Sequence, residues 1–414
     1  MNRIDINADD RNHLRELARK CAEIAHLPET EEKTKAWIAH NKCEGYRPMM
    51  VVQLNNWDDI GLPLRCTDPL ALYFENQLQS CIVAHELIGD DYVTPPYIQV
   101  PLAINVLPFG IEKNITRAEK GPGYHVIPAE ENITRFLDTE PKTTYSYDAE
   151  LTNYRLDFAN EIMGDILPAK LVNDSHHYLF TPTMWVTEYM TMEKMYLAII
   201  DEPDALHRLM QTIEQDMIAY LKWQEDNGLL ILNNGSDFIA SGSYGFSDEL
   251  PRRHIAPGEI VKTTDIWGHI NSQESVGISP EMYKEFVAPY CHRIAEQFGL
   301  LYYGCCEAID TFWDSVSKYP NLRKLSISPW CDEAAMGEVL ANSKVIYARK
   351  PSPHFVAWQD EFQIDDFREY IKNTARLTRD CKVEYCFLDT CTVHSSPQKV
   401  NKMMEIVRQY GAYE

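Results

Sequence analysis

The chain has 414 residues, 45% of them apolar and 24% charged, which is the composition of a folded globular protein rather than a disordered one. It carries 39 Lys and Arg against 62 Asp and Glu, a formal net charge of −23, and this charge would repel nucleic acid and anionic membrane surfaces alike. The sequence has no run of about 18 apolar residues and no apolar leader at its start, so we expect a cytoplasmic protein that does not contact membranes.

Residues 1–150 predict N-terminal additions around the first elements of a larger fold. Apolar residues recur at helical spacing within the first 45 residues, residues 49–54 form a short apolar run typical of a buried strand, and residues 69–88 return to helical spacing. Residues 90–150 are rich in Pro, Gly, Thr and Tyr. This composition predicts hairpins or a long excursion from the main fold.

Residues 151–414 predict core βα units, because strand-like and helix-like segments alternate regularly. A long helix starts at Pro203 and ends at Asn227, and a strand is expected next, over 229–234. Ser279 caps a second helix that starts at Pro280. Further strands are expected over 300–306, 324–330, 345–351 and 382–389, and the last three of these are each followed by a helix. The fold predicted is α/β, a (β/α)8 TIM barrel with N-terminal helical and hairpin additions, forming a single domain over 1–414.

Cysteines stand at the ends of the predicted barrel strands, where the active site of such a barrel lies. Three of the last four strand ends carry one: Cys305-Cys306-Glu307, Trp330-Cys331 and Asp389-Thr390-Cys391. Without export the 11 cysteines remain reduced, and thiolates arriving from separate strands are suitable ligands for a catalytic zinc ion, which keeps three protein ligands and one open position. The alternative is that they pack as small apolar residues, as we expect for Cys386.

Strand alternation separates the two adjacent cysteines, because neighbouring side chains of a regular strand point to opposite faces. If the strand ends near Gly304, the loop can turn Cys306 and Glu307 inward together, so Cys306 ranks above Cys305. Cys331 and His394 are weaker candidates for ligands. The other candidates are polar residues near strand ends, with an Asx turn or a packing role as the alternative. They are Asn233 and Asp237 for catalysis, and His177, Asn234, Trp330 and Arg349 for substrate binding.

Several of these segments together resemble the uroporphyrinogen decarboxylase superfamily, and within it the methyltransferase branch. They are residues 175–237, ISPEMYKEFVAPYCHRIAEQFGL, YYGCCEAID, LSISPWCD, YARKPSP and LDTCTVHSSPQ, spread over residues 170–412. The resemblance implies a (β/α) barrel in which a His-x-Cys at one strand end and a Cys at the last strand end bind zinc. Cys391 lies within about one residue of the last position. Tyr303 or Gly304 stands where the family has His, so Glu307 or the second cysteine would supply the missing ligand.

The resemblance does not extend to decarboxylation of porphyrinogens. That branch holds its polyanionic substrate with cations after the first strand, where this chain has Asn55, Asn56, Asp58 and Asp59. The sequence therefore predicts a zinc-dependent methyltransferase that moves a methyl group between a corrinoid protein and a small-molecule donor or acceptor, such as a thiol, a pterin or a methylated compound. The chain has no corrinoid-binding DxHxxG motif, so a partner protein would present the methyl-corrinoid.

Two other functions remain open at this point. One is a metal-free decarboxylase or lyase of a small carboxylic acid that relies on Asn233, Asp237, Arg349 and Lys350. The other is a non-catalytic binding protein with inert, packed cysteines. The sequence does not determine the assembly, for which a homodimer is one option.

Overall fold

The computed structural model describes residues 6–54, 56–112, 114–117, 124–127, 130, 132–173, 179–355, 363–390, 392–394 and 396–411. Three residues discussed above lie outside the described residues, namely Asn55, His177 and Cys391. In the described part of the chain, no helix is both long enough and apolar enough to cross a membrane.

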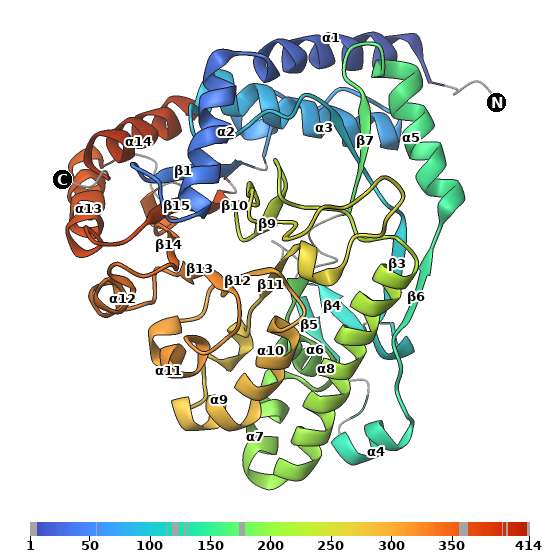
Figure 1. Cartoon of the computed structure of the whole chain (residues 1–414), viewed down its shortest axis with the longest axis vertical. Coiled ribbons are helices and arrows are strands. Elements are labelled where there is room, and N and C mark those ends of the chain that lie inside the picture. The colour runs from blue at the N-terminus through green and yellow to red at the C-terminus, as the bar shows by residue number, and fades with distance from the viewer. Residues whose placement is uncertain are drawn as a thin grey trace.

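A parallel sheet of seven strands forms the centre of the fold (Figure 1). Its strands, in spatial order, are β1 (Met49–Leu54), β15 (Val383–Thr390), β14 (Ile346–Arg349), β13 (Leu322–Ile327), β12 (Leu300–Tyr303), β11 (Trp267–Ile270) and β8 (Leu179–Phe180). The predicted α/β class is confirmed. Among the described residues β1 and β8 remain the two edges of this sheet, so closure into an eight-stranded barrel stays a prediction.

Helices α5 to α14 lie between residues 149 and 410, and several of them begin where local sequence signals place them. They are α5 (Ala149–Met163), α6 (Pro182–Met190), α7 (Met192–Asp201), α8 (Pro203–Asp226), α9 (Pro280–Phe286), α10 (Ala288–Ala295), α11 (Trp313–Val316), α12 (Glu333–Leu340), α13 (Ile364–Leu377) and α14 (Pro397–Tyr410). Ser279 accepts the Met282 N–H at 3.2 Å and so caps α9, as predicted. Asp332 caps α12 in the same way, through two main-chain N–H groups.

The N-terminal additions form a second apolar core. The first 45 residues contain two helices, α1 (Ala8–Ala25) and α2 (Pro28–Asn41), because Pro28 begins a new helix directly after the first one ends. Helix α1 packs with α3 (Pro69–Val83) and α5, and the parallel pair β2 (Ile98–Pro101) and β7 (Ala169–Val172) completes this layer. Leu14, Phe74 and Phe158 are fully buried at its centre.

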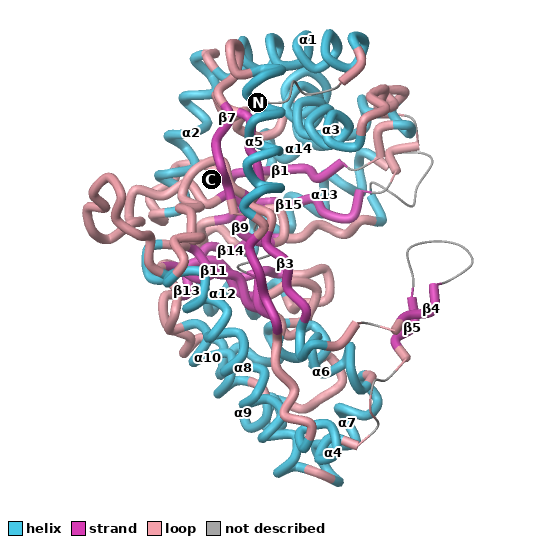
Figure 2. The backbone as a smooth tube through the Cα atoms, turned by 90° about the vertical axis from the view of Figure 1, so that its right-hand side faces the viewer, coloured by secondary structure: helices cyan, strands magenta, loops and turns pink. Residues whose placement is uncertain are grey.

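The predicted hairpin region is confirmed as two antiparallel pairs. Strand β3 (Ile104–Leu107) pairs with β6 (Thr144–Tyr147), and β4 (Ile115–Arg117) pairs with β5 (Tyr124–Val126). Figure 2 shows that β4 and β5 project away from the body of the molecule. The short helix α4 (Ile133–Asp138) follows them. These elements add to the outside of the fold and do not enter the central sheet.

The strand predicted over residues 229–234 is wrong. Leu229 and Leu230 are buried, but the segment makes no strand pairing. The Asn233 side chain takes the place of a neighbouring strand: its amide donates to the Trp267 carbonyl at 3.0 Å and its oxygen accepts the Trp267 N–H at 2.9 Å. One side chain thus satisfies both main-chain groups of Trp267, and β11 pairs with β8 further along, at His269 and Ile270.

The two faces of the central sheet differ in character. Leu301, Tyr303 and Tyr347 face the helices, in the large apolar core that α8 to α14 complete. Tyr302 and Ala348 point to the opposite, inner face, where they pack against a hairpin of β9 (Phe238–Ala240) and β10 (Ser243–Tyr244). This hairpin, seen in Figure 1, lies against the inner face. Hydrogen bonds join Ser241, at its tip, to Cys305 and Lys350.

Candidate functional site

The candidate site starts at the turn that ends β12. Gly304 has a φ of +96°, a conformation that side-chain-bearing residues rarely adopt, and a Cβ there would lie 3.1 Å from the Cβ of Ser326 on β13. Glycine is therefore strongly favoured at this point. The strand ends at Tyr303, which is the condition under which Cys306 could turn inward. Cys305 and Cys306 therefore do not have to point to opposite faces of the sheet.

The turn brings the two adjacent thiols to one place. Cys305 is half-buried and Cys306 is exposed, and their sulfur atoms lie 3.6 Å apart. The Ser241 hydroxyl, at the tip of the β9–β10 hairpin, donates to Cys305 Sγ at 3.4 Å. Two thiolates on one tetrahedral zinc ion, with Zn–S bonds of about 2.3 Å, are separated by about 3.8 Å. The pair therefore fits two of the ligand positions of such an ion.

The carboxylate of Glu307 is already bound by main-chain N–H groups, unlike a carboxylate that is free to bind a metal ion. Its carboxylate is buried, Oε1 accepts the Ser272 N–H at 3.0 Å, and Oε2 accepts the Cys305 N–H at 2.8 Å. Burial raises the pKa of Glu307 to about 7, although these hydrogen bonds oppose the shift. Both oxygens thus serve to fix the loop that carries the thiols.

Among the described residues, no group of three His, Cys, Asp or Glu side chains is arranged to hold a metal ion. Cys391, the third cysteine predicted as a zinc ligand, lies outside the described residues. The two described thiols fit zinc by their spacing, whereas Glu307 would have to leave a main-chain partner to join them.

A polar layer lies next to the thiols on the inner face. Lys350 Nζ donates to the Tyr302 hydroxyl at 2.8 Å and to the Ser241 carbonyl. His269 Nε2 lies 3.0 Å from the Gly304 carbonyl oxygen, and the His269 ring packs edge-on against Tyr302. Burial lowers the pKa of His269 to about 4, and the nearby charge of Lys350 contributes to this shift. His269 is therefore neutral at neutral pH.

A second charged cluster lies deeper on the same face, toward the start of the strands. Lys324 Nζ is 2.8 Å from Glu384 Oε2, and His40 Nε2 from α2 is 3.3 Å from the same oxygen. All three side chains are fully buried. Burial opposes ionisation of Glu384, but the charge of Lys324 and the contact with His40 hold the pKa of Glu384 well below its usual range. This cluster is internally neutralised.

The polar residues predicted after the segment 229–234 occupy structural positions. Asn233 binds the main chain of Trp267, as described above, and the Asn234 amide donates to the carbonyls of Ser247 and Leu250 at 3.2 and 2.6 Å. Asp237 precedes β9 at the base of the hairpin, and burial raises its pKa. Their predicted roles in catalysis or substrate binding stay predictions, and the structure does not place Asn233 or Asn234 beside the thiols.

The candidates at the other strand ends are dispersed. Arg349 points to the outer side of the sheet, where it pairs with Glu333 and donates to the Tyr370 hydroxyl at 2.5 Å. Trp330 is 75% exposed at the surface. Cys331 is buried and its sulfur accepts the Ile309 N–H at 3.3 Å, while the His394 side chain is exposed. None of these predicted roles is tested by the structure.

Sequence reasoning missed His269, Tyr302 and Ser241, which surround the thiols and Lys350. The strand that carries His269 has four residues, Trp267–Ile270, which is too short to show an alternation pattern. Alternation along β12 could have identified Tyr302 as inward-facing, but Ser241 lies in a hairpin tip far from the other residues in sequence, and no local signal connects it to them.

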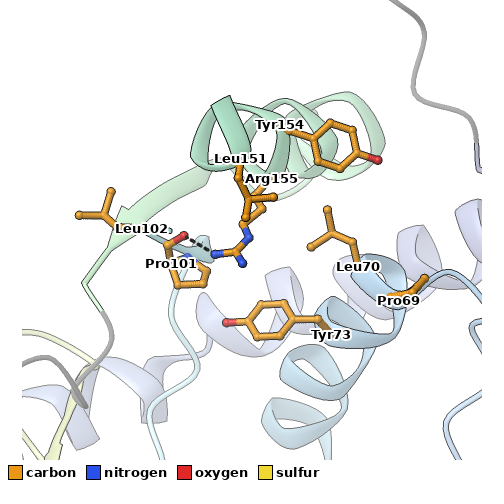
Figure 3. Close-up of a pocket in the computed structure, with 8 residues that line it drawn as sticks. All are labelled: Pro69, Leu70, Tyr73, Pro101, Leu102, Leu151, Tyr154 and Arg155. Carbon is orange, nitrogen blue, oxygen red and sulfur yellow. Dashed lines mark hydrogen bonds between the residues drawn. The ribbon is translucent and has the colours of Figure 1, made fainter. Parts of the chain in front are cut away.

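A cavity of about 480 Å³ lies elsewhere, among the N-terminal additions. Figure 3 shows its walls, which come from α3, α5 and the end of β2, with Arg155 directed between Tyr73 and Leu151. Arg155 donates to the Pro101 carbonyl at 3.3 Å. The cavity contains none of the cysteines and none of the predicted site residues.

Comparison with known proteins gives a likeness of fold. No protein-family model matches the chain, and no curated protein matches it. Among solved structures, a methyltransferase from Methanosarcina mazei is similar over 92% of this chain and 99% of that chain, with a TM-score of 0.51 and 13% sequence identity. At this identity the likeness concerns the fold, and it extends over nearly the whole of both chains.

Proposed function

We propose that this chain is a zinc-dependent methyltransferase that moves a methyl group between a corrinoid protein and a small molecule. The observation that carries the proposal is the pair of sulfur atoms of Cys305 and Cys306, 3.6 Å apart at a strand end, because this spacing suits two zinc ligands. The solved structure of similar fold, which covers nearly the whole chain, is that of a methyltransferase, and this supports the same reaction class.

In this proposal Cys305, Cys306 and Cys391 hold the metal, and Glu307 either joins them or keeps their loop in place. When bound, zinc would keep a thiol of the substrate, or of the protein, ionised at neutral pH. Side chains of this protein would position the metal ligands and leave the site open to its partner. Ser241 orients the Cys305 sulfur, and the exposed side of Cys306 faces the solvent, from which a partner protein would approach.

Metal analysis of protein prepared without chelators tests the proposal. We expect about one zinc ion per chain, lost in Cys306→Ala and in Cys391→Ala. Cys331→Ala is the matched control, because that thiol also follows a strand of the sheet but is buried against main-chain groups. Zinc content that is negligible, or that is unchanged by Cys306→Ala and Cys391→Ala, would refute the metal site. Methyl transfer from methylcobalamin to a simple alkyl thiol then tests the reaction.

A metal-free decarboxylase or lyase is the second candidate, and one observation favours it. Glu307 already uses both oxygens on main-chain N–H groups, while Lys350 supplies a buried cation close to the thiols, which suits a small carboxylic acid. This alternative requires turnover that does not change after chelator treatment. The zinc proposal requires turnover that falls with the metal content and returns when zinc is restored.

A further inference from the structure

Two buried lysines point onto the inner face of the sheet, and their partners differ. Lys324 lies 2.8 Å from the carboxylate of Glu384. Lys350 continues the pairing of β14 with β13 through its N–H, which donates to the Ile327 carbonyl at 2.9 Å, and its side chain is 5% exposed. Across the described residues, both hydrogen-bond acceptors of Lys350 Nζ are neutral, and no carboxylate lies within ion-pair distance of it.

A buried ammonium group with only neutral partners is an incomplete arrangement. The protein interior removes most of its hydration, and a hydroxyl and a carbonyl replace only part of the lost stabilisation. His269 nearby carries no negative charge in either protonation state, so it cannot balance the ammonium group. The chain as a whole carries a net charge of −23, so this positive site is not a consequence of its composition. An anion of suitable size would complete it.

The ammonium group and the thiols share one neighbour. The Ser241 carbonyl accepts from Lys350 Nζ, and the Ser241 hydroxyl donates to Cys305 Sγ at 3.4 Å. Ser241 is itself only partly buried at the hairpin tip, and Cys306 beside it is exposed. A small molecule that reaches the thiols from solvent is therefore separated from the Lys350 ammonium only by Ser241.

We propose that Lys350 binds an anionic oxygen group, a carboxylate or a phosphate, of the small molecule that reacts at the Cys305–Cys306 site. This inference names the substrate class of the site and rests on the function proposed above. The anionic group takes the position next to Nζ that the Ser241 carbonyl now holds, so the full negative charge of a ligand replaces the partial charge of a peptide oxygen. The reacting end of the molecule then lies toward the thiols.

Protection of the thiols from alkylation tests the site directly. Chelator-treated protein is labelled with neutral iodoacetamide at constant ionic strength, in chloride, acetate or inorganic phosphate, and labelling of Cys305 and Cys306 is followed by mass spectrometry. We expect about 50 mM acetate or phosphate to slow labelling about threefold relative to chloride, as for a dissociation constant in the tens of millimolar. The acetate and phosphate arms distinguish the two anion classes.

Three variants make the result specific. Lys350→Met should abolish the protection, Lys350→Arg should retain it, and Lys344→Met, at an exposed lysine six residues earlier, should leave it unchanged. If Lys350→Met does not fold, the wild-type protein still tests the proposal through the ratio of two labelling rates, that of anionic iodoacetate divided by that of iodoacetamide. This ratio should be higher for Cys305 and Cys306 than for the thiol of glutathione. The proposal would be overturned by equal protection in chloride, by protection that persists in Lys350→Met, or by a ratio no higher than that of glutathione.

The outcome is separate from that of the metal proposal, because the labelling uses protein without metal. Protection by anions together with an absence of zinc in metal analysis would refute the proposed function and keep the anion site. Normal zinc content without protection would refute the anion site alone.

Discussion

Replacing Lys324 by methionine tests how strongly the fold depends on the charged cluster beneath the candidate site. The Lys324 ammonium lies 2.8 Å from Glu384 Oε2, and both side chains are fully buried. The substitution leaves the Glu384 carboxylate without its nearest cation, and breaking a buried pair in this way costs about 3–5 kcal/mol. We expect Lys324→Met to lower the free energy of unfolding by that amount, measured by urea denaturation followed by circular dichroism.

The double variant shows whether the loss comes from the missing ion pair or from the Glu384 charge that is left unpaired. Lys324→Met with Glu384→Leu replaces both charges by apolar groups, and such replacements are often neutral or stabilising. We therefore expect the loss in the free energy of unfolding to shrink to about 1–2 kcal/mol, which reflects the missing contact of His40 with Glu384. Lys344→Met, at an exposed position, should change the free energy of unfolding by less than about 0.5 kcal/mol. A loss below about 1 kcal/mol for Lys324→Met, or a double variant that loses the sum of the single losses, would refute the reasoning.

Three further predictions concern His269, Gly304 and Asn233. The pKa of an imidazole is about 6.5 in the unfolded chain, whereas that of His269 is about 4 in the folded protein. The free energy of unfolding should therefore fall by up to about 3 kcal/mol as the pH is lowered from 6.5 to 4. His269→Gln should remove that loss in acid denaturation curves. Gly304→Ala should lower the free energy of unfolding by about 1–3 kcal/mol. It should lower it more than Gly258→Ala, which has a φ of +84° but no neighbouring atoms, and equal losses would contradict the contact with β13. Asn233→Ala leaves two buried main-chain groups of Trp267 without partners and should cost about 2–4 kcal/mol in thermal or urea unfolding; a stable variant without turnover would instead assign Asn233 to catalysis.

Local sequence signals predicted several helix starts and several strands correctly. Pro203 and Pro280 begin helices because a proline lacks the N–H that the first helical turn leaves unused, and Asp332 caps a helix because its carboxylate accepts two free N–H groups. These effects act within a few residues and can be recognised in one segment. The strands near residues 300, 324, 346 and 383 are confirmed for the same reason, since their apolar character is local.

The errors concern features that depend on a partner elsewhere in the chain. Residues 229–234 have the composition of a strand, but the Asn233 side chain occupies the hydrogen-bonding groups that a strand would need on Trp267. The metal role predicted for Glu307 is not such an error and stays a prediction, but the sequence could not show that Ser272, from another loop, supplies one of the N–H groups that hold its carboxylate. Neither partner can be identified from the sequence near the residue that it binds.

The sequence by itself determined an acidic α/β protein whose adjacent cysteines stand at a strand end, because composition, apolar periodicity and the Gly304 turn are properties of single segments. Tertiary structure alone decided which groups surround those thiols. The β9–β10 hairpin folds onto the inner face and brings Ser241 between Cys305 and Lys350, and parallel pairing of the strands places His269 and Tyr302 beside them. A side chain's direction follows from its own strand, but its neighbours follow from strand register and from loops that return from distant parts of the chain.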